Sequence, residues 1–268
     1  MDTNSAPTPV DGPPDDEVTD DAALGGRLRL KQPRQGHRFG HDAILLAAAT
    51  DARPGEHAVE FGAGVGAAGL ALATRVSGVS VTLIEIDEKL AALARENAER
   101  NGLAALVKVV ALDVGASPQE FDAAGLGSGT AARILMNPPF NDRGRQNTSP
   151  DEARRLAHSA TPTTLPVWLG SASRLLKSSG VLTLIWRAEG LFDVLNALSV
   201  HFGAVAIMPV HPRPDAPAIR VLVRAVKGSR GTLTILPRLI LNDESGRPTA
   251  EVEAVLRDNA PLNMSGAD

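Results

Sequence analysis

One amide and one aromatic ring flank a pair of prolines in the middle of the chain, in the motif Asn137-Pro138-Pro139-Phe140. The apolar run before it, residues 131–136, is typical of a buried strand, and two successive prolines end a strand because they donate no backbone hydrogen bond. The side-chain oxygen of Asn137 and a carbonyl oxygen of Pro138 can both accept from a planar amino group, while Phe140 can stack on the ring that carries it. An ordinary strand that ends in a Pro-Pro turn has the same pattern. The chemical interpretation is a clamp for an amino group, with Asn137, Pro138 and Phe140 as catalytic residues.

A glycine-rich turn lies upstream, where a short strand pattern gives way to a helical one. Glycines at such a turn let a ligand approach the backbone closely, and the N-terminus of the following helix favours polar or anionic groups. Two cofactors fit the spacing. A dinucleotide would use Gly64-x-Gly66-x-x-Gly69, and S-adenosylmethionine would use Glu60-x-Gly62-x-Gly64-x-Gly66.

Two more carboxylates close predicted strands. Glu85 ends the next strand, 21 residues beyond Gly64, where a carboxylate can accept hydrogen bonds from both ribose hydroxyls of an adenosine. Asp113 ends a third strand, near the expected position of an adenine. Together with Glu60 and Asn137, these carboxylates lie at the carboxyl ends of strands, where parallel sheets bind ligands. Because hydride transfer has no use for an amide clamp, the combination favours S-adenosylmethionine over a nicotinamide cofactor.

Strand and helix patterns alternate along most of the chain, which predicts an α/β domain with a largely parallel sheet. Asp42 looks like the N-cap of an apolar helix over residues 43–49. Trp168 and Trp186 are expected in the core. The predicted strands are residues 56–61, 79–86, 107–113, 133–136, 180–186, 205–210 and 219–226.

The composition excludes several classes of protein. The chain has 268 residues, enough for one large domain, and its 43% of hydrophobic residues supports a packed core. It has no cysteine, which excludes disulfides and thiolate metal sites, and its histidines lack the spacing of metal ligands. No apolar run approaches the ~18 residues of a membrane span, and the acidic N-terminus does not resemble a secretory signal. We therefore expect a cytoplasmic protein with no metal and no membrane partner.

Acidic residues concentrate at the N-terminus. Residues 1–25 hold seven acidic side chains and no basic one, so subtracting their −7 from the net charge of −4 leaves +3 on the rest. Their polar composition predicts a disordered tail, which is either a solvated extension or an arm that competes with nucleic acid for a basic face. We expect this tail over residues 1–25, a domain over 26–258 with an entry segment over 26–50 and a core over 56–227, and a flexible C-terminus over 259–268.

Basic side chains cluster in three segments, residues 27–38, 143–155 and 220–230. Such clusters are often merely solvated, but beside a nucleotide-binding core they suit contacts with phosphates. The segment after Phe140 is long, and long loops beside a site often gate it or hold substrate. The candidate RNA contacts are Arg34, Arg143, Arg145, Arg220 and Arg224.

Three groups of residues resemble the class I S-adenosylmethionine-dependent methyltransferases of the small group, and most of all the bacterial tRNA(1)Val adenine-N6-methyltransferases. The first is an entry motif, Gln32-Pro33-x-x-Gly36-x-Arg38-Phe39-x-x-Asp42-Ala43-x-Leu45-Leu46-Ala47. The second joins the glycine motif to Ile84-Glu85-Ile86-Asp87 and Glu96-Asn97-x-x-x-Asn101-Gly102. The third is the Asn-Pro-Pro-Phe motif. Together they cover about residues 26–140.

The resemblance implies a Rossmann-like fold with a seven-stranded, mostly parallel sheet, helices on both faces and an antiparallel last strand. It implies S-adenosylmethionine as cofactor, RNA (above all tRNA) as partner, and methylation of an adenine N6 in an anticodon loop. It also implies that Arg38 and Asp42 close over the methionine end of the cofactor. The cofactor-binding candidates are Glu60, Gly62, Gly64, Gly66, Glu85, Asp113, Asn137, Arg38 and Asp42.

Similar Asn-Pro-Pro-aromatic motifs leave other acceptors open. They occur in ribosomal RNA guanine-N2, DNA adenine-N6 and protein glutamine-N5 methyltransferases, and a catalytically inert RNA-binding module is a further alternative. Aromatic residues make up 3% of the chain, with no tyrosine, which leaves few stacking platforms besides Phe39 and Phe140. The oligomeric state and the function of the tail stay open.

Overall fold

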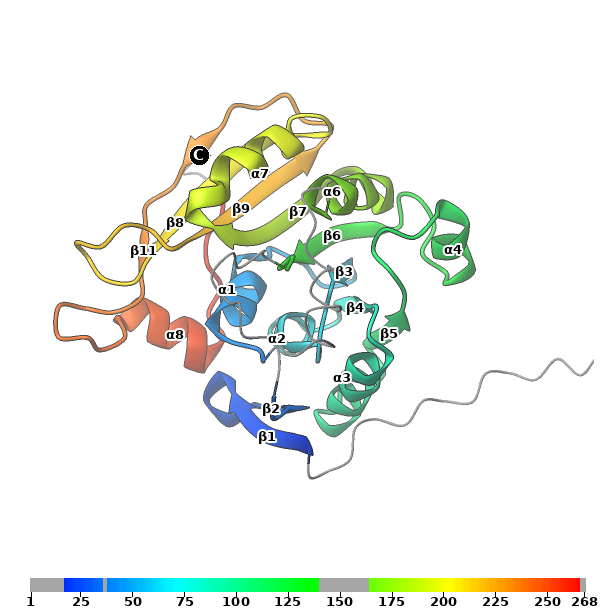
Figure 1. The fold of residues 1–268 in the computed structure, drawn as a ribbon, viewed down its shortest axis with the longest axis horizontal. Helices are drawn as coiled ribbons and strands as arrows, with labels where there is room; N and C mark the ends of the chain where they lie inside the picture. Colours follow the sequence, from blue (N-terminus) through cyan, green and yellow to red (C-terminus); the bar gives the residue numbers. More distant parts are fainter. Residues whose placement is uncertain (1–16, 36–37, 140–163, 266–268) are drawn as a thin grey trace, which may run out of the picture.

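A twisted sheet with helices on both faces forms the centre of the computed structural model, which describes residues 17–35, 38–139 and 164–265 (Figure 1). The sheet has nine strands in the order β10-β8-β9-β7-β6-β3-β4-β5, with β11 also paired to β8. Two of the nine are only two residues long. The strands are β3 (His57–Phe61), β4 (Ser80–Glu85), β5 (Val107–Ala111), β6 (Ala131–Met136), β7 (Leu176–Arg187), β8 (Phe202–His211), β9 (Arg220–Lys227), β10 (Thr234–Ile235) and β11 (Leu239–Ile240).

The seven long strands have the predicted arrangement. Strands β3 to β7 pair in parallel, whereas β9 lies antiparallel between β7 and β8. The central strands are buried on both faces, and all six residues of β6 are buried, as expected of parallel strands covered by helices. The sheet therefore confirms the Rossmann-like class I fold.

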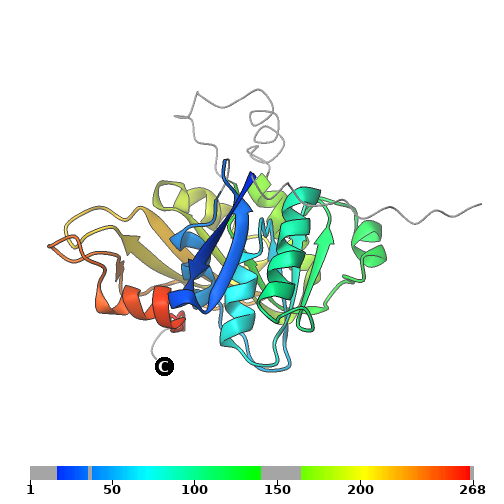
Figure 2. The ribbon, with the colours of Figure 1, turned by 90° about the horizontal axis from the view of Figure 1, so that it is seen from below.

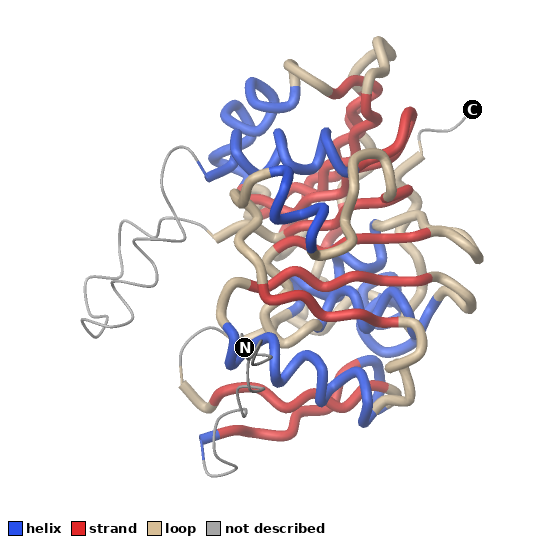
Figure 3. Tube along the Cα trace, turned by 90° about the vertical axis from the view of Figure 1, so that its right-hand side faces the viewer, coloured by secondary structure: helices blue, strands red, loops and turns tan. Residues whose placement is uncertain are grey.

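Helices cover the sheet in two groups, each with its own hydrophobic core. Apolar side chains of α1, α2 and α8 pack on one face, and those of α4, α6 and α7 pack on the other. Figure 3 shows the strands as a central layer between these helices. The helices are α1 (His41–Ala49), α2 (Ala67–Arg75), α3 (Glu88–Arg100), α4 (Pro118–Ala123), α6 (Thr164–Leu175), α7 (Leu191–Leu198) and α8 (Ala250–Asp258), with 3-10 turns η2 (Leu24–Gly26) and η3 (Ala188–Gly190).

A hairpin of β1 (Val18–Ala23) and β2 (Leu28–Pro33) lies outside the helices, beside α3 (Figure 2). It corrects the predicted boundary of the disordered tail, because residues 17–25 are ordered and bury Val18 and Leu24. Two acidic side chains of this ordered part, Asp20 and Asp21, form ion pairs with arginines. Asp20 pairs with Arg29 at 3.2 Å and with Arg100 at 2.6 Å, which neutralises the local excess of negative charge.

The predicted flexible C-terminus is also wrong for residues 259–265. Asn259 takes a left-handed conformation (φ 58°) that ends α8, and its amide donates to the carbonyl oxygen of Ala71 at 3.0 Å. Beyond it, Leu262 is buried and donates its backbone N–H to Ala48 at 2.8 Å. The segment is apolar enough to add to the core, so it packs against α1 and α2.

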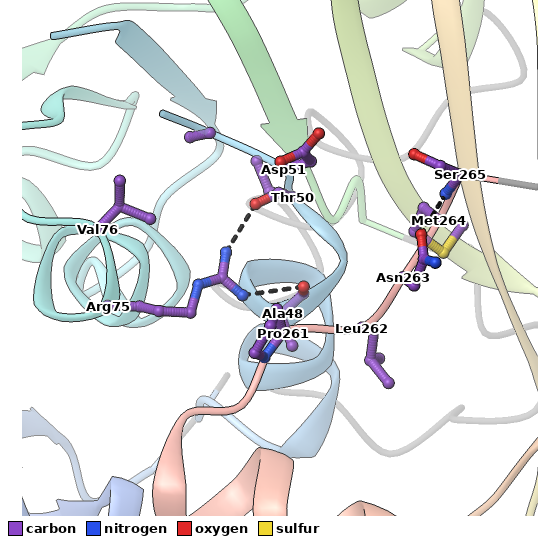
Figure 4. A pocket seen from close by; sticks show the side chains of 11 residues that line it. Ala48, Thr50, Asp51, Arg75, Val76, Pro261, Leu262, Asn263, Met264 and Ser265 are labelled. Carbon is purple, nitrogen blue, oxygen red and sulfur yellow. Dashed lines mark hydrogen bonds between the residues drawn. The ribbon is translucent and has the colours of Figure 1, made fainter. Parts of the chain in front are cut away.

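A shallow pocket of about 470 Å³ lies between this C-terminal segment and the end of α1. Figure 4 shows Arg75 of α2 reaching across it, and its guanidinium donates to the carbonyl oxygens of Ala48 at 2.9 Å and Thr50 at 2.6 Å. These contacts satisfy carbonyls at the helix C-terminus. Asp51 also lines the pocket, and its backbone oxygen accepts from Arg133 near the start of β6. The pocket therefore lies at the opposite end of β6 from Asn137.

Candidate functional site

Three neighbouring strands end in register at one edge of the sheet. Phe61 of β3 lies opposite both Met136 of β6 and Ile84 of β4. The residues that follow them, Gly62, Asn137 and Glu85, therefore leave the sheet at the same level. Because neighbouring strands are about 4.8 Å apart, this register places the predicted amino clamp beside the predicted cofactor loop.

The glycine loop adopts a backbone that only glycine takes without strain. Gly62, Gly64 and Gly66 have φ values of 62°, 57° and 86°, and Gly66 is the N-cap of α2. Space is restricted as well, since a Cβ atom on Gly62 would lie 2.5 Å from the ring of Trp168, and one on Gly66 would lie 2.8 Å from Leu83. The loop can therefore present its backbone to a ligand at close range.

Glu60 lies beneath this loop. Its side chain is 5% exposed, and its Oε2 accepts the backbone N–H of Gly69 at 2.6 Å. Burial raises the pKa of Glu60 to about 8, although the Gly69 hydrogen bond works in the opposite direction. The carboxylate thus supports the first turn of α2, and its predicted contact with a cofactor stays a prediction.

Glu85 is the last residue of β4 and is held by two backbone amides. Its Oε2 accepts from Gly64 at 2.7 Å and its Oε1 accepts from Asp87 at 2.9 Å. Burial is the largest effect on its pKa and raises it. Each carboxylate oxygen has a second lone pair, so the group can still accept hydrogen bonds from ribose hydroxyls.

Two exposed apolar side chains near the strand ends were not predicted as site residues. Ile86 follows Glu85 directly and is 59% exposed, which is unusual for an isoleucine at a strand end in a buried sheet. Val167 of α6 is also exposed, and it lies 3.3 Å from the position of a Cβ atom built on Gly115. Two exposed aliphatic side chains beside a polar edge suit the faces of a flat purine.

Asp113 lies two residues beyond the end of β5, which closes at Ala111 and not at the predicted residue 113. Its Oδ1 accepts the backbone N–H of Gly115 at 2.7 Å, and its chain neighbour Leu112 donates to the backbone oxygen of Glu85 at 3.0 Å. The turn after β5 is thereby fixed next to β4, and Asp113 is exposed.

Asn137 carries the most informative side chain of the site. Its Oδ1 is buried and has no hydrogen-bond partner among the described residues. An unsatisfied buried acceptor costs about 1–3 kcal/mol, so such groups in native proteins usually await a ligand, a water or a catalytic partner. Pro138 beside it is buried too. Phe140, the stacking residue expected from the motif, lies outside the described residues.

Trp168, predicted to lie in the core, packs against it and also borders the site. It comes from α6 and is only partly buried. Its ring packs edge-to-face on Phe61, with 6.1 Å between the ring centroids, and reaches under Gly62. Sequence alone gave no signal for this contact, because it joins elements about one hundred residues apart.

The entry segment is ordered by ion pairs of its own. Arg38 donates to Asp21 Oδ2 at 2.9 Å, and Asp42 accepts from Arg220 Nε at 2.8 Å. Asp42 is not the predicted N-cap, since α1 begins at His41, two residues before the predicted start, with Gly40 in the cap position. The predicted contacts of Arg38 and Asp42 with a cofactor remain predictions.

The arginines predicted to contact RNA differ in their position relative to the site and in their burial. Arg220 begins β9, opposite Arg187 at the end of β7, and therefore lies at the edge where Asn137 leaves the sheet. Arg224 is half-buried deeper in the sheet, where burial and then the charge of Arg133 lower its pKa. It is thus poorly placed for phosphates.

Arg34 is held through its backbone N–H, which donates to the backbone oxygen of Glu17 at 2.9 Å. Arg143 and Arg145 lie outside the described residues.

Two features are absent from the part of the chain that the structure describes. It contains no helix long and apolar enough to cross a membrane. Within the same ranges, no three His, Asp or Glu side chains gather in a way that could hold a metal ion.

Comparison with known proteins identifies the family of this chain. Residues 38–210 match the model of the methyltransferase small domain, which is more than half of the chain. A tRNA1(Val) (adenine(37)-N6)-methyltransferase from Bacteroides thetaiotaomicron is 27% identical over 201 residues, 73% of this chain and 79% of that protein. A release factor glutamine methyltransferase from Chlorobaculum tepidum is 27% identical over 177 residues, 64% of this chain and 59% of that protein.

Solved structures agree with the family model. A predicted O-methyltransferase from Agrobacterium tumefaciens superimposes with a TM-score of 0.69 at 31% identity, covering 82% of this chain and 98% of that one. An S-adenosylmethionine-dependent O-methyltransferase from Thermotoga maritima, at 17% identity and a TM-score of 0.51, shares the fold. The glycine loop, the buried acid of β4 and the unsatisfied amide of Asn137 fit that chemistry. The chain belongs to the methyltransferase small-domain family, and its methyl donor is S-adenosylmethionine.

Proposed function

We propose that the protein methylates an exocyclic amino nitrogen of a nucleobase in RNA, with adenine N6 in a tRNA anticodon loop as the expected target. The observation that carries this proposal is the buried, unsatisfied Oδ1 of Asn137, which leaves the sheet at the level of Gly62 and Glu85. An acceptor held there, next to the loop that suits the methyl donor, matches the donor hydrogens of an amino group.

The exocyclic amine of adenine is a poor nucleophile because its lone pair is delocalised into the ring. Asn137 Oδ1 and the carbonyl oxygen of Pro138 can each accept one of its two hydrogens, which holds the nitrogen in place and favours the lone pair out of the ring plane. S-adenosylmethionine supplies an electrophilic methyl group. The chain then contributes position and electrostatics, and no strong general base is required.

The number of hydrogens on the methyl-accepting group distinguishes the possible substrates. An amino group or a primary amide brings two hydrogens to two acceptors, whereas a hydroxyl brings one and would leave a buried acceptor unpaired. The clamp therefore favours N-methylation over the O-methylation named for the Agrobacterium protein. It does not separate adenine from a glutamine amide, so the choice of RNA rests on the basic segments and on the tRNA-modifying relatives.

The residues proposed for RNA contact are the basic groups at the clamp edge and in the segment after it. Arg220 and Arg34 belong to the described part, Arg143 and Arg145 do not, and Phe140 is proposed to stack on the target base. Contacts of this kind neutralise phosphates and release counterions, so RNA affinity should fall steeply with salt.

A transfer assay tests the proposal. The protein is incubated with methyl-labelled S-adenosylmethionine and either unmodified tRNA transcripts, ribosomal RNA or cell protein, and the labelled RNA is digested to nucleosides for mass spectrometry. We expect N6-methyladenosine in tRNA, formed about 10²–10³-fold more slowly by Asn137→Ala. Label on protein would reassign the enzyme to glutamine amides, and label on a guanine of ribosomal RNA would reassign the base.

A further inference from the structure

We propose that Asn97 of α3 is a positioning residue for the cofactor, because it ties the glycine loop to the edge of the entry hairpin. The inference rests on S-adenosylmethionine as methyl donor and is independent of the acceptor that the enzyme methylates. It gives a role to an asparagine that the amino clamp and the acids at the strand ends do not use.

The side chain of Asn97 is fully buried and makes three hydrogen bonds, all to backbone groups. Its Oδ1 accepts the N–H of Lys31 at 2.8 Å, and its Nδ2 donates to the carbonyl oxygen of Lys31 at 2.9 Å. The same Nδ2 donates to the carbonyl oxygen of Val65 at 3.1 Å. One amide thus joins strand β2 to the loop between Gly64 and Gly66, across residues far apart in the sequence.

Val65 needs this partner because its neighbours have unusual backbone angles. With Gly64 and Gly66 both at positive φ, the peptide units around Val65 cannot form a regular ladder. On one side, the N–H of Gly64 donates to Glu85 at 2.7 Å, and on the other Asn97 holds the carbonyl of Val65. Two consecutive residues of the cofactor loop are therefore fixed from opposite sides.

Apolar packing reinforces the same junction. The side chain of Val65 is buried in a small cluster with Val18 of the hairpin and Leu93 of α3. Phe39, in the entry segment, packs on the cluster as well. The hairpin, α3 and the cofactor loop thus form one unit, through which the hairpin contributes to the geometry of the loop.

A second asparagine provides a matched comparison. Asn101 lies one helical turn beyond Asn97 and binds β2 in the same way, accepting the N–H of Arg29 at 2.9 Å and donating to its carbonyl oxygen at 2.8 Å. Its remaining contact is the backbone oxygen of Asn97 in its own helix, at 2.7 Å. Both asparagines secure the free edge of the hairpin, but only Asn97 also holds the cofactor loop.

Calorimetric titration with S-adenosylhomocysteine tests the proposal on variants that remain folded by circular dichroism. Both Asn97→Ala and Asn101→Ala should lower the melting temperature, because each leaves backbone groups of β2 unpaired. Only Asn97→Ala should weaken binding, by about tenfold, the effect of losing one hydrogen bond in a preorganised loop. Equal affinities for the two variants would show that Asn97 is only structural.

Amide hydrogen exchange on the unmodified protein tests the same coupling if Asn97→Ala fails to fold. The N–H groups of Lys31 and Arg29 are both bound by asparagine side chains at the outer edge of β2. Saturation with S-adenosylhomocysteine should slow exchange at Lys31 several-fold more than at Arg29. An equal change at both amides, or none at either, would overturn the proposal, whereas failure to methylate RNA would leave it unaffected.

Discussion

Replacement of Asn137 by alanine should separate catalysis from stability. In the described structure its Oδ1 is buried without a hydrogen-bond partner, a situation that costs the folded state about 1–3 kcal/mol. Removing the amide relieves this cost and removes little apolar contact. Asn137→Ala should therefore melt no lower than the parent protein, and gains of about 2–4 °C per kcal/mol relieved are expected for a chain of this size.

The same change should remove most of the activity. If Asn137 holds the reacting amine, its loss should lower turnover by about 10²–10³-fold, as for one preorganised contact that strengthens in the transition state. Cofactor affinity should change little. Turnover is measured under single-turnover conditions with saturating RNA, cofactor affinity by calorimetry, and melting temperature by scanning calorimetry.

Thr183 of β7 offers a matched control. Its hydroxyl is also buried and unpaired among the described residues, but it lies within the sheet, beside Leu135, which precedes Asn137 by two residues on β6. Thr183→Val keeps the shape and should raise the melting temperature without changing turnover. If Asn137→Ala were fully active and melted several degrees lower, the unsatisfied oxygen would be an ordinary structural group and the clamp would be wrong.

Three other predictions concern the cofactor, pH and the N-terminus. Glu85→Ala should weaken binding of S-adenosylmethionine by roughly 10- to 100-fold in calorimetry, since hydrogen bonds to a charged group contribute about 1.5–3 kcal/mol; an unchanged affinity would contradict its assignment. The pKa of Glu60 is raised to about 8, so the folded state holds this proton more tightly than the unfolded state, and stability should fall as pH rises from about 4.5 to about 8. Glu60→Gln should reduce that dependence in denaturant titrations, and an unchanged slope would exclude Glu60 as its source. Deleting residues 1–25 removes β1 and the buried Leu24 and should lower the melting temperature by many degrees, whereas deleting 1–16 should not.

The strand ends of the site could be predicted because each is marked locally. Glycines at Gly62 and Gly64, the charge of Glu85 and the prolines after Asn137 each interrupt an apolar run, and such interruptions are visible in any window of sequence. Their common level in the sheet follows from the parallel register of β3, β4 and β6. A class of fold and a set of candidate residues were therefore within reach of the sequence.

The acidic strand β1 of the hairpin could not be predicted, because its stability depends on distant partners. Asp20 looks like part of an acidic, disordered segment, yet it pairs with Arg100, eighty positions away. The hydrogen bonds of Asn97 and Asn101 with β2 are equally remote, at separations of 66 and 72 residues. The composition of a segment indicates how readily that segment stays solvated, but it does not reveal contacts with residues far away in the sequence.

The basic edge of the site holds less free charge than the sequence suggests. Arg220 at the clamp edge is paired with Asp42, and Arg38 of the entry segment is paired with Asp21, so the positive charge of both arginines is largely balanced. Such partly exposed pairs are individually weak, and a phosphate can compete for the guanidinium. Binding an RNA there would exchange one anionic partner for another instead of neutralising an unpaired cation. Any preference for RNA over a protein amide must therefore come from several basic groups acting together, because the hydrogen-bond geometry at Asn137 is the same for both acceptors.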